Sequence, residues 1–208
     1  MGLVKPHHVA PSGKNERKRT RDLAGLVAEL EDPNATARRW AARDLRDWPG
    51  ASAALLDRLM REPDHSVREV ILTTLTLSAL GDAVAVAALV SLLRSEDANL
   101  RNEAIEAMKH LPVEVAAVMG GLLEDPYPDV RIFAVNILES LRHPDVESWL
   151  LAVIARDPHL NVCATAVDLL GEVGSVRAVE PLRLLKARFG GEPYIQFAAD
   201  LALSRIEG

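Results

Sequence analysis

The chain is poor in cysteine and in aromatic residues. Of its 208 residues one is Cys and 4% are aromatic. The single cysteine, Cys163, cannot form an internal disulfide, so we expect a reducing compartment and a cytoplasmic protein. With so few aromatic rings the core must consist of Ala, Leu and Val. Ala and Leu lose little on entering a helix, so the composition favours an all-α fold.

Long hydrophobic runs are also missing. The most apolar stretch, residues 83–93, has eleven residues between Asp82 and Arg94. A membrane-spanning helix needs about 20. The first residues lack the positive start and following apolar run of a signal peptide. We therefore expect no contact with a membrane.

Charge is unevenly distributed. Residues 1–21 contain six Lys or Arg against Glu16, a net charge of +5, whereas the rest of the chain carries −11 of the total of −6. We expect residues 1–19 to form a flexible basic arm and residues 20–208 to form the folded body. The arm either solubilises the chain or contacts an acidic partner, nucleic acid or the acidic body itself.

One segment recurs along the whole body. An acidic residue and a short turn, often with Pro, precede an apolar residue, Arg and a helix-forming stretch. The Arg position marks six copies, 30 to 33 residues apart: Arg38, Arg68, Arg101, Arg131, Cys163 and Gln196. Self-similarity at such a period is typical of helical repeat proteins.

Each copy has the pattern of an amphipathic helix. Counted from the residue before the marker, apolar side chains stand at offsets 0, +4, +8 and mostly +11, as in Ala37, Ala41, Leu45 and Trp48. These offsets share one helical face. Another apolar helix precedes each copy. Because such a hairpin cannot bury its face alone, we expect an α-solenoid of about six hairpins with about twelve antiparallel helices.

The pattern resembles the HEAT repeats, in particular the bacterial type related to phycobilisome-lyase repeats. Residues 169–174 (LLGEVG) and 178–182 (AVEPL) are close to the usual sequences of that family. The resemblance covers about residues 20–208 and implies the HEAT fold. This architecture serves scaffolds, chaperones and a few enzymes, so it leaves the function open.

The resemblance also implies a structural ladder, in which an acidic residue six positions before each Arg pairs with arginines of adjacent repeats. Asp97 lies closer to Arg101, and Asp157 precedes Cys163 instead of Arg. We expect these carboxylates to cap the second helices or to pair with Arg at the repeat junctions. The matching pairs are Asp32 with Arg38, Glu62 with Arg68, and Asp125 with Arg131.

Offsets +2, +6 and +9 point outward and line the concave surface in HEAT-like stacks. This stripe changes from basic through acidic to apolar along the chain, which predicts a polarised groove for an extended peptide or a helix. The alternative is an ordinary solvated helix face. The expected partner-binding residues, with Trp40 added because no preceding repeat covers it, are Arg39, Trp40, Arg43, Arg46, Glu69, Thr73, Asn102, Glu106, Ile132, Asn136, Glu139, Asp168, Phe197 and Leu201.

The two ends of the array are polar where internal copies are apolar. Asp44 stands at offset +7 of the first copy and Asp200 at offset +5 of the last. Terminal repeats need a polar outer side, so we expect the array to begin and end within this chain.

Signals for catalysis are weak. No phosphate-binding loop, nucleophile elbow, zinc-protease motif or paired-cysteine metal spacing occurs. His65, His110 and His143 each have a Glu four residues later, but they belong to different turns and are not expected to converge. Cys163 reads as a small buried thiol. We therefore expect no catalytic residue, no cofactor and no metal.

The sequence thus predicts a non-enzymatic adaptor or scaffold that is a monomer alone and binds another protein on the concave face. Two alternatives remain. The resemblance implies a bilin lyase or lyase-chaperone subunit, and the basic arm suggests association with nucleic acid. The second is disfavoured because the body is acidic, although the arm and Arg39, Arg43 and Arg46 keep it open.

Overall fold

A computed structural model describes residues 22–208 of the chain. Within this range the chain forms twelve α-helices and two short 3-10 helices and contains no strand. The basic arm predicted for residues 1–19 lies outside the described residues.

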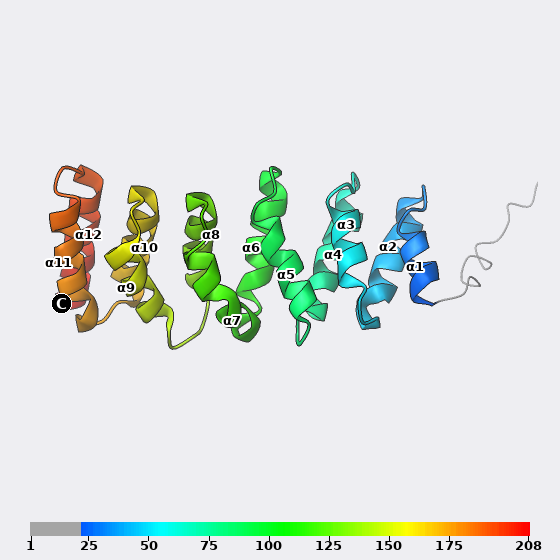
Figure 1. Ribbon diagram of the computed structural model, residues 1–208, viewed down its shortest axis with the longest axis horizontal. Helices are drawn as coiled ribbons and strands as arrows, with labels where there is room; N and C mark the ends of the chain where they lie inside the picture. The colour runs from blue at the N-terminus through cyan, green and yellow to red at the C-terminus, as the bar shows by residue number, and fades with distance from the viewer. Residues whose placement is uncertain (1–21) are drawn as a thin grey trace, which may run out of the picture.

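The helices form six consecutive hairpins that stand in a row (Figure 1). The first helices of the hairpins are α1 (Leu23–Glu29), α3 (Ser52–Leu59), α5 (Ala83–Leu92), α7 (Pro112–Leu123), α9 (Val146–Arg156) and α11 (Val179–Arg188). The second helices are α2 (Ala35–Asp44), α4 (His65–Ser78), α6 (Ala98–Lys109), α8 (Pro128–Leu138), α10 (Leu160–Val173) and α12 (Pro193–Glu207). The 3-10 helices are η2 (Leu45–Asp47) and η3 (Val176–Ala178). The predicted all-α solenoid of six hairpins is confirmed.

Local sequence fixes where the second helices begin. The side chains of Asn34, Asp64 and Asp97 accept hydrogen bonds from backbone N–H groups in the first turns of α2, α4 and α6. Helices α8 and α12 instead begin with Pro128 and Pro193. Both devices suit a helix start, because the first N–H groups have no partner within the helix and Pro has no N–H. The residues of these turns therefore define the first residue of the second helix that follows.

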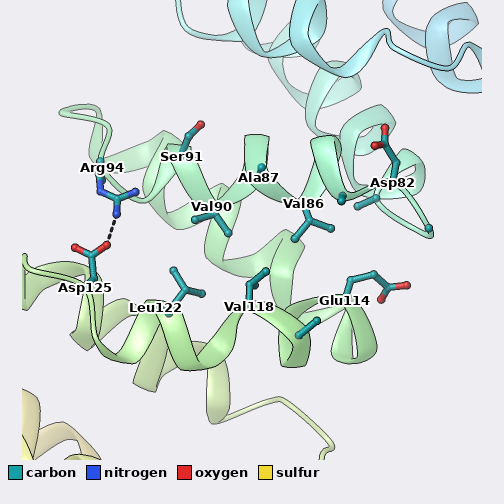
Figure 2. Close-up of a pocket in the computed structure, with 15 residues that line it drawn as sticks. Asp82, Val86, Ala87, Val90, Ser91, Arg94, Glu114, Val118, Leu122 and Asp125 are labelled. Atoms are coloured by element: carbon teal, nitrogen blue, oxygen red, sulfur yellow. Dashed lines mark hydrogen bonds and ion pairs between the residues drawn. The ribbon is translucent and has the colours of Figure 1, made fainter.

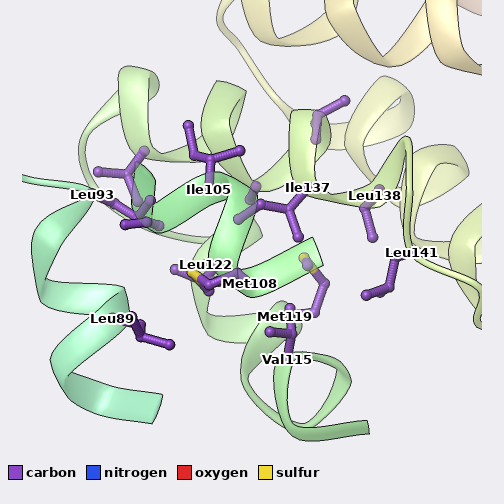
Figure 3. Close-up of a cluster of buried hydrophobic side chains, with 14 of the residues drawn as sticks. Leu89, Leu93, Ile105, Met108, Val115, Met119, Leu122, Ile137, Leu138 and Leu141 are labelled. Atoms are coloured by element: carbon purple, nitrogen blue, oxygen red, sulfur yellow. The ribbon is translucent and has the colours of Figure 1, made fainter. Parts of the chain in front are cut away.

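A continuous apolar core runs through all six hairpins. The residue at offset +4 is fully buried in every second helix, and it is Ala in five of the six. Such a small side chain lets neighbouring helices approach closely. Figure 3 shows how Leu89 of α5, Met108 of α6, Met119 of α7 and Leu138 of α8 share one cluster. Each hairpin thus completes the core of its neighbours, as expected for a solenoid.

The prediction that the apolar residue at offset +11 lies on the buried helical face is wrong in two copies. Trp48 is 37% exposed and Val173 is 45% exposed. In the first copy α2 ends at Asp44 and the chain tightens into η2, which takes Trp48 off the helical face. In the fifth copy Val173 is the last residue of α10. At the outer ends of the array, Asp44 is half-buried and Asp200 is exposed and paired with Lys186.

The marker arginines join consecutive hairpins. The guanidinium of Arg38 makes two hydrogen bonds of 2.7 and 2.8 Å to the carboxylate of Glu62 in the next hairpin. Arg68 reaches Asp97 at 3.1 Å. Arg131 binds Asp157 at 2.6 and 3.0 Å. Each of these pairs links one second helix to the turn that precedes the following second helix.

Arg38 and Arg131 also bind their own turns, through backbone carbonyls. The Nη1 atom of Arg38 donates to the carbonyl of Asp32 at 2.9 Å, and that of Arg131 donates to the carbonyl of Asp125 at 2.8 Å. The residue six positions before the marker thus offers its backbone oxygen to the arginine of its own repeat. In Glu62, Asp125 and Asp157 the carboxylate is left free to accept from the backbone two residues further on and from an arginine of the preceding hairpin.

The third junction uses a different arginine. Asp97 pairs with Arg68 and not with Arg101, whose Nη1 donates to the carbonyl of Ser95 at 2.7 Å. Arg94, which follows α5, then provides the ion pair to Asp125. The shorter Asp97–Arg101 spacing reflects this exchange, because Ser95 occupies the place of the acidic residue.

At the last junction, between the fifth and sixth hairpins, the marker residue is Cys163, which forms no ion pair with a carboxylate. Cys163 is fully buried, and its Sγ lies 3.3 Å from the carbonyl oxygen of Asp157. Arg188 of α11 donates to the carbonyls of Ala155 and Asp157 at 2.9 and 3.0 Å and lies 3.1 Å from Sγ. Burial raises the pKa of the Cys163 thiol, so it stays protonated.

Removing Glu62 should destabilise the solenoid strongly. Its side chain is 0% exposed and accepts from both Arg38 and Arg58. Glu62→Ala leaves two arginines without their carboxylate, so we expect the free energy of unfolding in urea to fall by about 3–5 kcal/mol. Asp57→Ala, which removes a carboxylate 70% exposed, is the control and should cost under about 1 kcal/mol. Equal losses of stability in the two variants would contradict a structural role for the buried Glu62 carboxylate.

Stability should also fall in acid because of Glu62. Burial raises its pKa, but the hydrogen bonds from Arg38, the Asp64 backbone and Arg58 outweigh burial and hold the pKa below the ordinary 4.5. A lowered folded-state pKa means that the contribution is complete above about pH 4.5 and is lost as the pH falls through the folded value. Urea unfolding between pH 6 and pH 3 should therefore show a steeper loss in wild type than in Glu62→Gln. Parallel curves would exclude this role.

Candidate protein-binding surfaces

The predicted partner-binding residues lie on the surface formed by the second helices. Ile132 and Asn136 are half-buried and the other twelve are exposed. The exposed residues are Arg39, Trp40, Arg43, Arg46, Glu69, Thr73, Asn102, Glu106, Glu139, Asp168, Phe197 and Leu201. Of the fourteen side chains, Ile132 packs against the apolar core. We call this surface the second-helix face.

The basic end of the second-helix face contains a groove of about 760 Å³ between α2 with η2 and α4. Arg39, Arg43 and Arg46 line it together with the exposed apolar residues Trp48 and Leu77. The acidic residues Asp44, Asp47 and Glu69 also line this groove, which we call the arginine groove. Among residues 22–208, no salt bridge joins these three arginines to a carboxylate. The three arginines are exposed, and Arg39 donates to the Ser66 hydroxyl at 3.4 Å.

Trp40 lies beside the same cluster and is 47% exposed. The guanidinium of Arg43 lies 5.7 Å from the centre of its ring, within the range of a cation–π contact. The ring thus holds Arg43 on the surface without neutralising it.

Further along the face the acidic residues are partly engaged. Glu106 forms a salt bridge of 3.0 Å with Lys109. Asp168 accepts a hydrogen bond of 2.8 Å from the Tyr194 hydroxyl, and this bond raises the pKa of Tyr194. At the far end, Phe197 is 67% exposed and Leu201 is exposed one turn later on α12. Glu106 and Asp168 are therefore engaged within the chain, and the last helix exposes the apolar residues Phe197 and Leu201.

A second groove, which the sequence did not predict, lies on the opposite helices of the hairpins. It has a volume of about 580 Å³ and separates α5 from α7. Figure 2 shows Val86 and Val90 of α5 facing Val118 and Leu122 of α7 across it. We call it the α5–α7 groove.

Small side chains on both helices leave this groove open. Ala87 and Ala117 line it, and Gly121 follows one turn after Ala117. A Cβ atom added at Gly121 would have no atom within 4 Å, and the same holds for Gly120 on the neighbouring side of α7. The sequence signal was present in the Gly120–Gly121 pair, but alanine-rich helices equally suit a closely packed core. Only the spacing of α5 and α7 distinguishes the two.

The histidines do not form a joint site. Within residues 22–208, no group of three His, Cys, Asp or Glu residues could hold a metal ion. His143 stacks on Trp149 with ring centres 5.0 Å apart. Glu147 accepts from the N–H and hydroxyl of Ser175 at 2.7 and 2.6 Å, and it pairs with Arg177.

Within residues 22–208, no helix combines the length and the apolar character that crossing a membrane requires.

Comparison with protein families identifies the repeats. A family model described as HEAT repeats matches residues 23–109 and 115–204, most of the chain. The chain belongs to the HEAT-repeat family. The arginine and carboxylate contacts at the turns are thus contacts between successive HEAT repeats.

This HEAT-repeat chain is similar to one curated protein and to several solved structures. It is 26% identical over 195 residues to "Uncharacterized phycocyanin operon protein Z" of Pseudanabaena tenuis (strain PCC 7409), covering 86% of this chain and 92% of that protein. An engineered protein from a structural genomics consortium shows 20% identity and a TM-score of 0.40, covering 89% of this chain and 98% of that one. The complex of CpcE and CpcF of phycocyanin lyase from Nostoc sp. PCC7120 shows 18% identity and a TM-score of 0.32, covering 97% and 100%. At these TM-scores the two structures do not inform the function.

Replacing the open glycines of α7 with alanine should stabilise this HEAT-repeat solenoid. In a helix interior Gly costs about 0.5–1 kcal/mol relative to Ala. Because the added methyl groups meet no neighbour, Gly120→Ala and Gly121→Ala should each raise the free energy of unfolding by up to that amount. Gly174→Ala is the control, since its Cβ would lie 2.4 Å from the Leu170 carbonyl and should destabilise. Thermal unfolding measures all three, and a loss at Gly121 would show that α5 and α7 pack closely.

Proposed function

We propose that this HEAT-repeat chain is a non-enzymatic scaffold that binds a partner protein along the second-helix face. The partner presents an extended segment or a helix, with acidic residues at the first two hairpins and apolar residues at the last. The repeat architecture supports this role, because stacked hairpins make a long surface for binding. The charge distribution along the face gives the bound segment a direction.

The observation that carries the proposal is the arginine groove between the first two hairpins. Arg39, Arg43 and Arg46 expose three positive charges in a body whose net charge is strongly negative. Carboxylates of a partner can accept charge-assisted hydrogen bonds from these guanidinium groups. Trp40 and Trp48 add exposed aromatic surface next to the charges, a combination enriched where proteins bind tightly.

A lyase-related role is a second candidate, supported by the similarity to the phycocyanin operon protein. That protein is 26% identical to this chain and aligns over 92% of its own length. If the chain acts in this way, it should promote transfer of a bilin to a phycobiliprotein subunit when both are supplied. Absence of any transferred chromophore in the presence of each candidate co-subunit would remove this alternative.

Charge reversal in the arginine groove tests the scaffold proposal. The variant Arg39→Glu/Arg43→Glu/Arg46→Glu should weaken binding of the partner co-purified from the native host by at least about tenfold, since three favourable charge contacts become repulsive. Its melting temperature should stay near that of wild type, because these side chains are exposed. Isothermal titration with the purified partner measures the change.

A matched control separates local from global charge effects. Arg142, Arg156 and Arg205 are exposed and lie outside the arginine groove. Their triple change to Glu alters the net charge equally and should leave partner binding unchanged. Equal weakening by both triple variants would contradict a specific groove. If the co-purified material is instead digested by nuclease, with binding lost on deletion of residues 1–21, the nucleic-acid alternative replaces the proposal.

A further inference from the structure

The α5–α7 groove lies on the first helices of the hairpins, separate from the second-helix face. Its walls are aliphatic, with Val86 and Val90 opposite Val118 and Leu122 (Figure 2). Helices α5 and α7 touch each other less extensively than α3 touches α5 or α9 touches α11. The contact between α7 and α9 is as limited as that between α5 and α7. The apolar walls of the α5–α7 groove therefore face each other without closing on each other.

The shape of the groove favours a helix as its occupant. Its walls are two α-helices running in the same direction, as the positions of Asp82 and Glu114 against Arg94 and Asp125 show (Figure 2). The backbone groups of these walls are already paired within each helix, so an extended peptide gains no ladder of hydrogen bonds here. A helix instead inserts side chains at i, i+3 or i+4, and i+7. Two turns of helix span about 11 Å, and the ten residues of α5 extend about 15 Å.

The charges at the two ends of the groove differ. Asp82 and Glu114 lie together at the end where α5 and α7 begin (Figure 2). At the other end, Arg94 and Asp125 pair with each other and cancel. The groove therefore has a net negative charge at one end only, which disfavours nucleic acid and acidic peptides and favours a basic group there.

The N-termini of α5 and α7, which are the positive ends of their dipoles, lie at the groove end with Asp82 and Glu114. A helix antiparallel to α5 and α7 places its C-terminus beside Asp82 and Glu114. Lys or Arg is favourable in the last turn of a helix, where the dipole is negative, and these cations would also face the two carboxylates. The antiparallel orientation therefore brings the negative end of the bound helix to the positive ends of α5 and α7, and the cations of its last turn offset the repulsion from the two carboxylates.

We infer that the α5–α7 groove binds an amphipathic helix of a partner protein, antiparallel to α5 and α7, with aliphatic side chains on one face and Lys or Arg in its last turn. This inference goes beyond the proposed function, because it concerns the opposite helices of the hairpins. Binding here leaves the arginine groove free for another segment.

Adjacent glycines provide a blocking variant and its control. Gly121 lines the α5–α7 groove, whereas Gly120 lines a different pocket between α7 and α9. Neither has an atom within 4 Å of an added Cβ. Gly121→Leu should fill the groove while the solenoid stays folded, and Gly120→Leu should add the same bulk without filling it. Ala87→Leu blocks the groove from the α5 side as a second variant. Circular dichroism and melting temperature verify that all three fold.

A library of helical peptides, displayed on phage and selected on the full wild-type chain with counter-selection on Gly121→Leu, is the probe. The expected peptides have aliphatic residues at i, i+3 or i+4, and i+7 followed by Lys or Arg. They should bind Gly120→Leu as tightly as wild type, and they should lose about tenfold or more on Gly121→Leu and Ala87→Leu. No enrichment, or peptides that bind Gly121→Leu as tightly as wild type, would overturn the inference.

Charge swapping tests the direction of the helix. Glu114→Lys should bind the selected peptide more weakly than wild type does. A peptide whose C-terminal Lys or Arg residues are replaced by Glu should bind this variant with restored affinity. Moving the basic residues to the first turn should weaken binding to wild type; unchanged affinity would overturn the antiparallel arrangement. Light scattering covers one other occupant: a doubled mass of wild type that Gly121→Leu abolishes would assign the groove to a second copy of this chain. The triple arginine variant should bind the peptides normally, so failure here is distinct from failure of the scaffold proposal.

Discussion

The guanidinium clamp between turns is the interaction on which the arrangement of the hairpins depends. Arg38 and Arg131 each hold a carbonyl of their own turn and a carboxylate of the next hairpin. An apolar interface between helices tolerates some sliding, because dispersion and burial have little directional preference. A bidentate arginine–carboxylate pair does not. The clamp therefore sets the register of one hairpin on the next, while the apolar core provides most of the driving force.

At two junctions other arginine contacts replace the clamp. At the third junction Ser95 replaces the acidic residue, and Arg94 supplies the ion pair to Asp125 from the turn after α5. At the fifth, Arg188 occupies the place beside Cys163 and binds carbonyl oxygens instead of a carboxylate. The requirement common to these junctions is a donor that satisfies the exposed ends of helices and turns. Residues of different helices meet it.

The two grooves result from opposite uses of the same scaffold. The second helices pack closely through alanine at offset +4, so their outer positions are free to carry charge without affecting the core. Helices α5 and α7 also carry small residues, but here the two helices do not pack closely, and a groove with aliphatic walls remains between them. One surface is therefore suited to a polar, directional segment, and the other to an apolar face of a helix. The proposed scaffold would hold one segment on each surface.

The sequence alone determined the six hairpins, the helical faces and the outward position of Arg39, Arg43 and Arg46. Helical periodicity is a local property of the sequence, and the same pattern recurs in each repeat. It also marked the arginines and acids of the turns. Only the tertiary structure decided which of them pair: Asp97 binds Arg68, and Asp125 binds Arg94, since partners in different hairpins are fixed by how the hairpins stack. The α5–α7 groove likewise depends on the distance between two helices, and alanine and glycine are compatible with both a closed and an open arrangement.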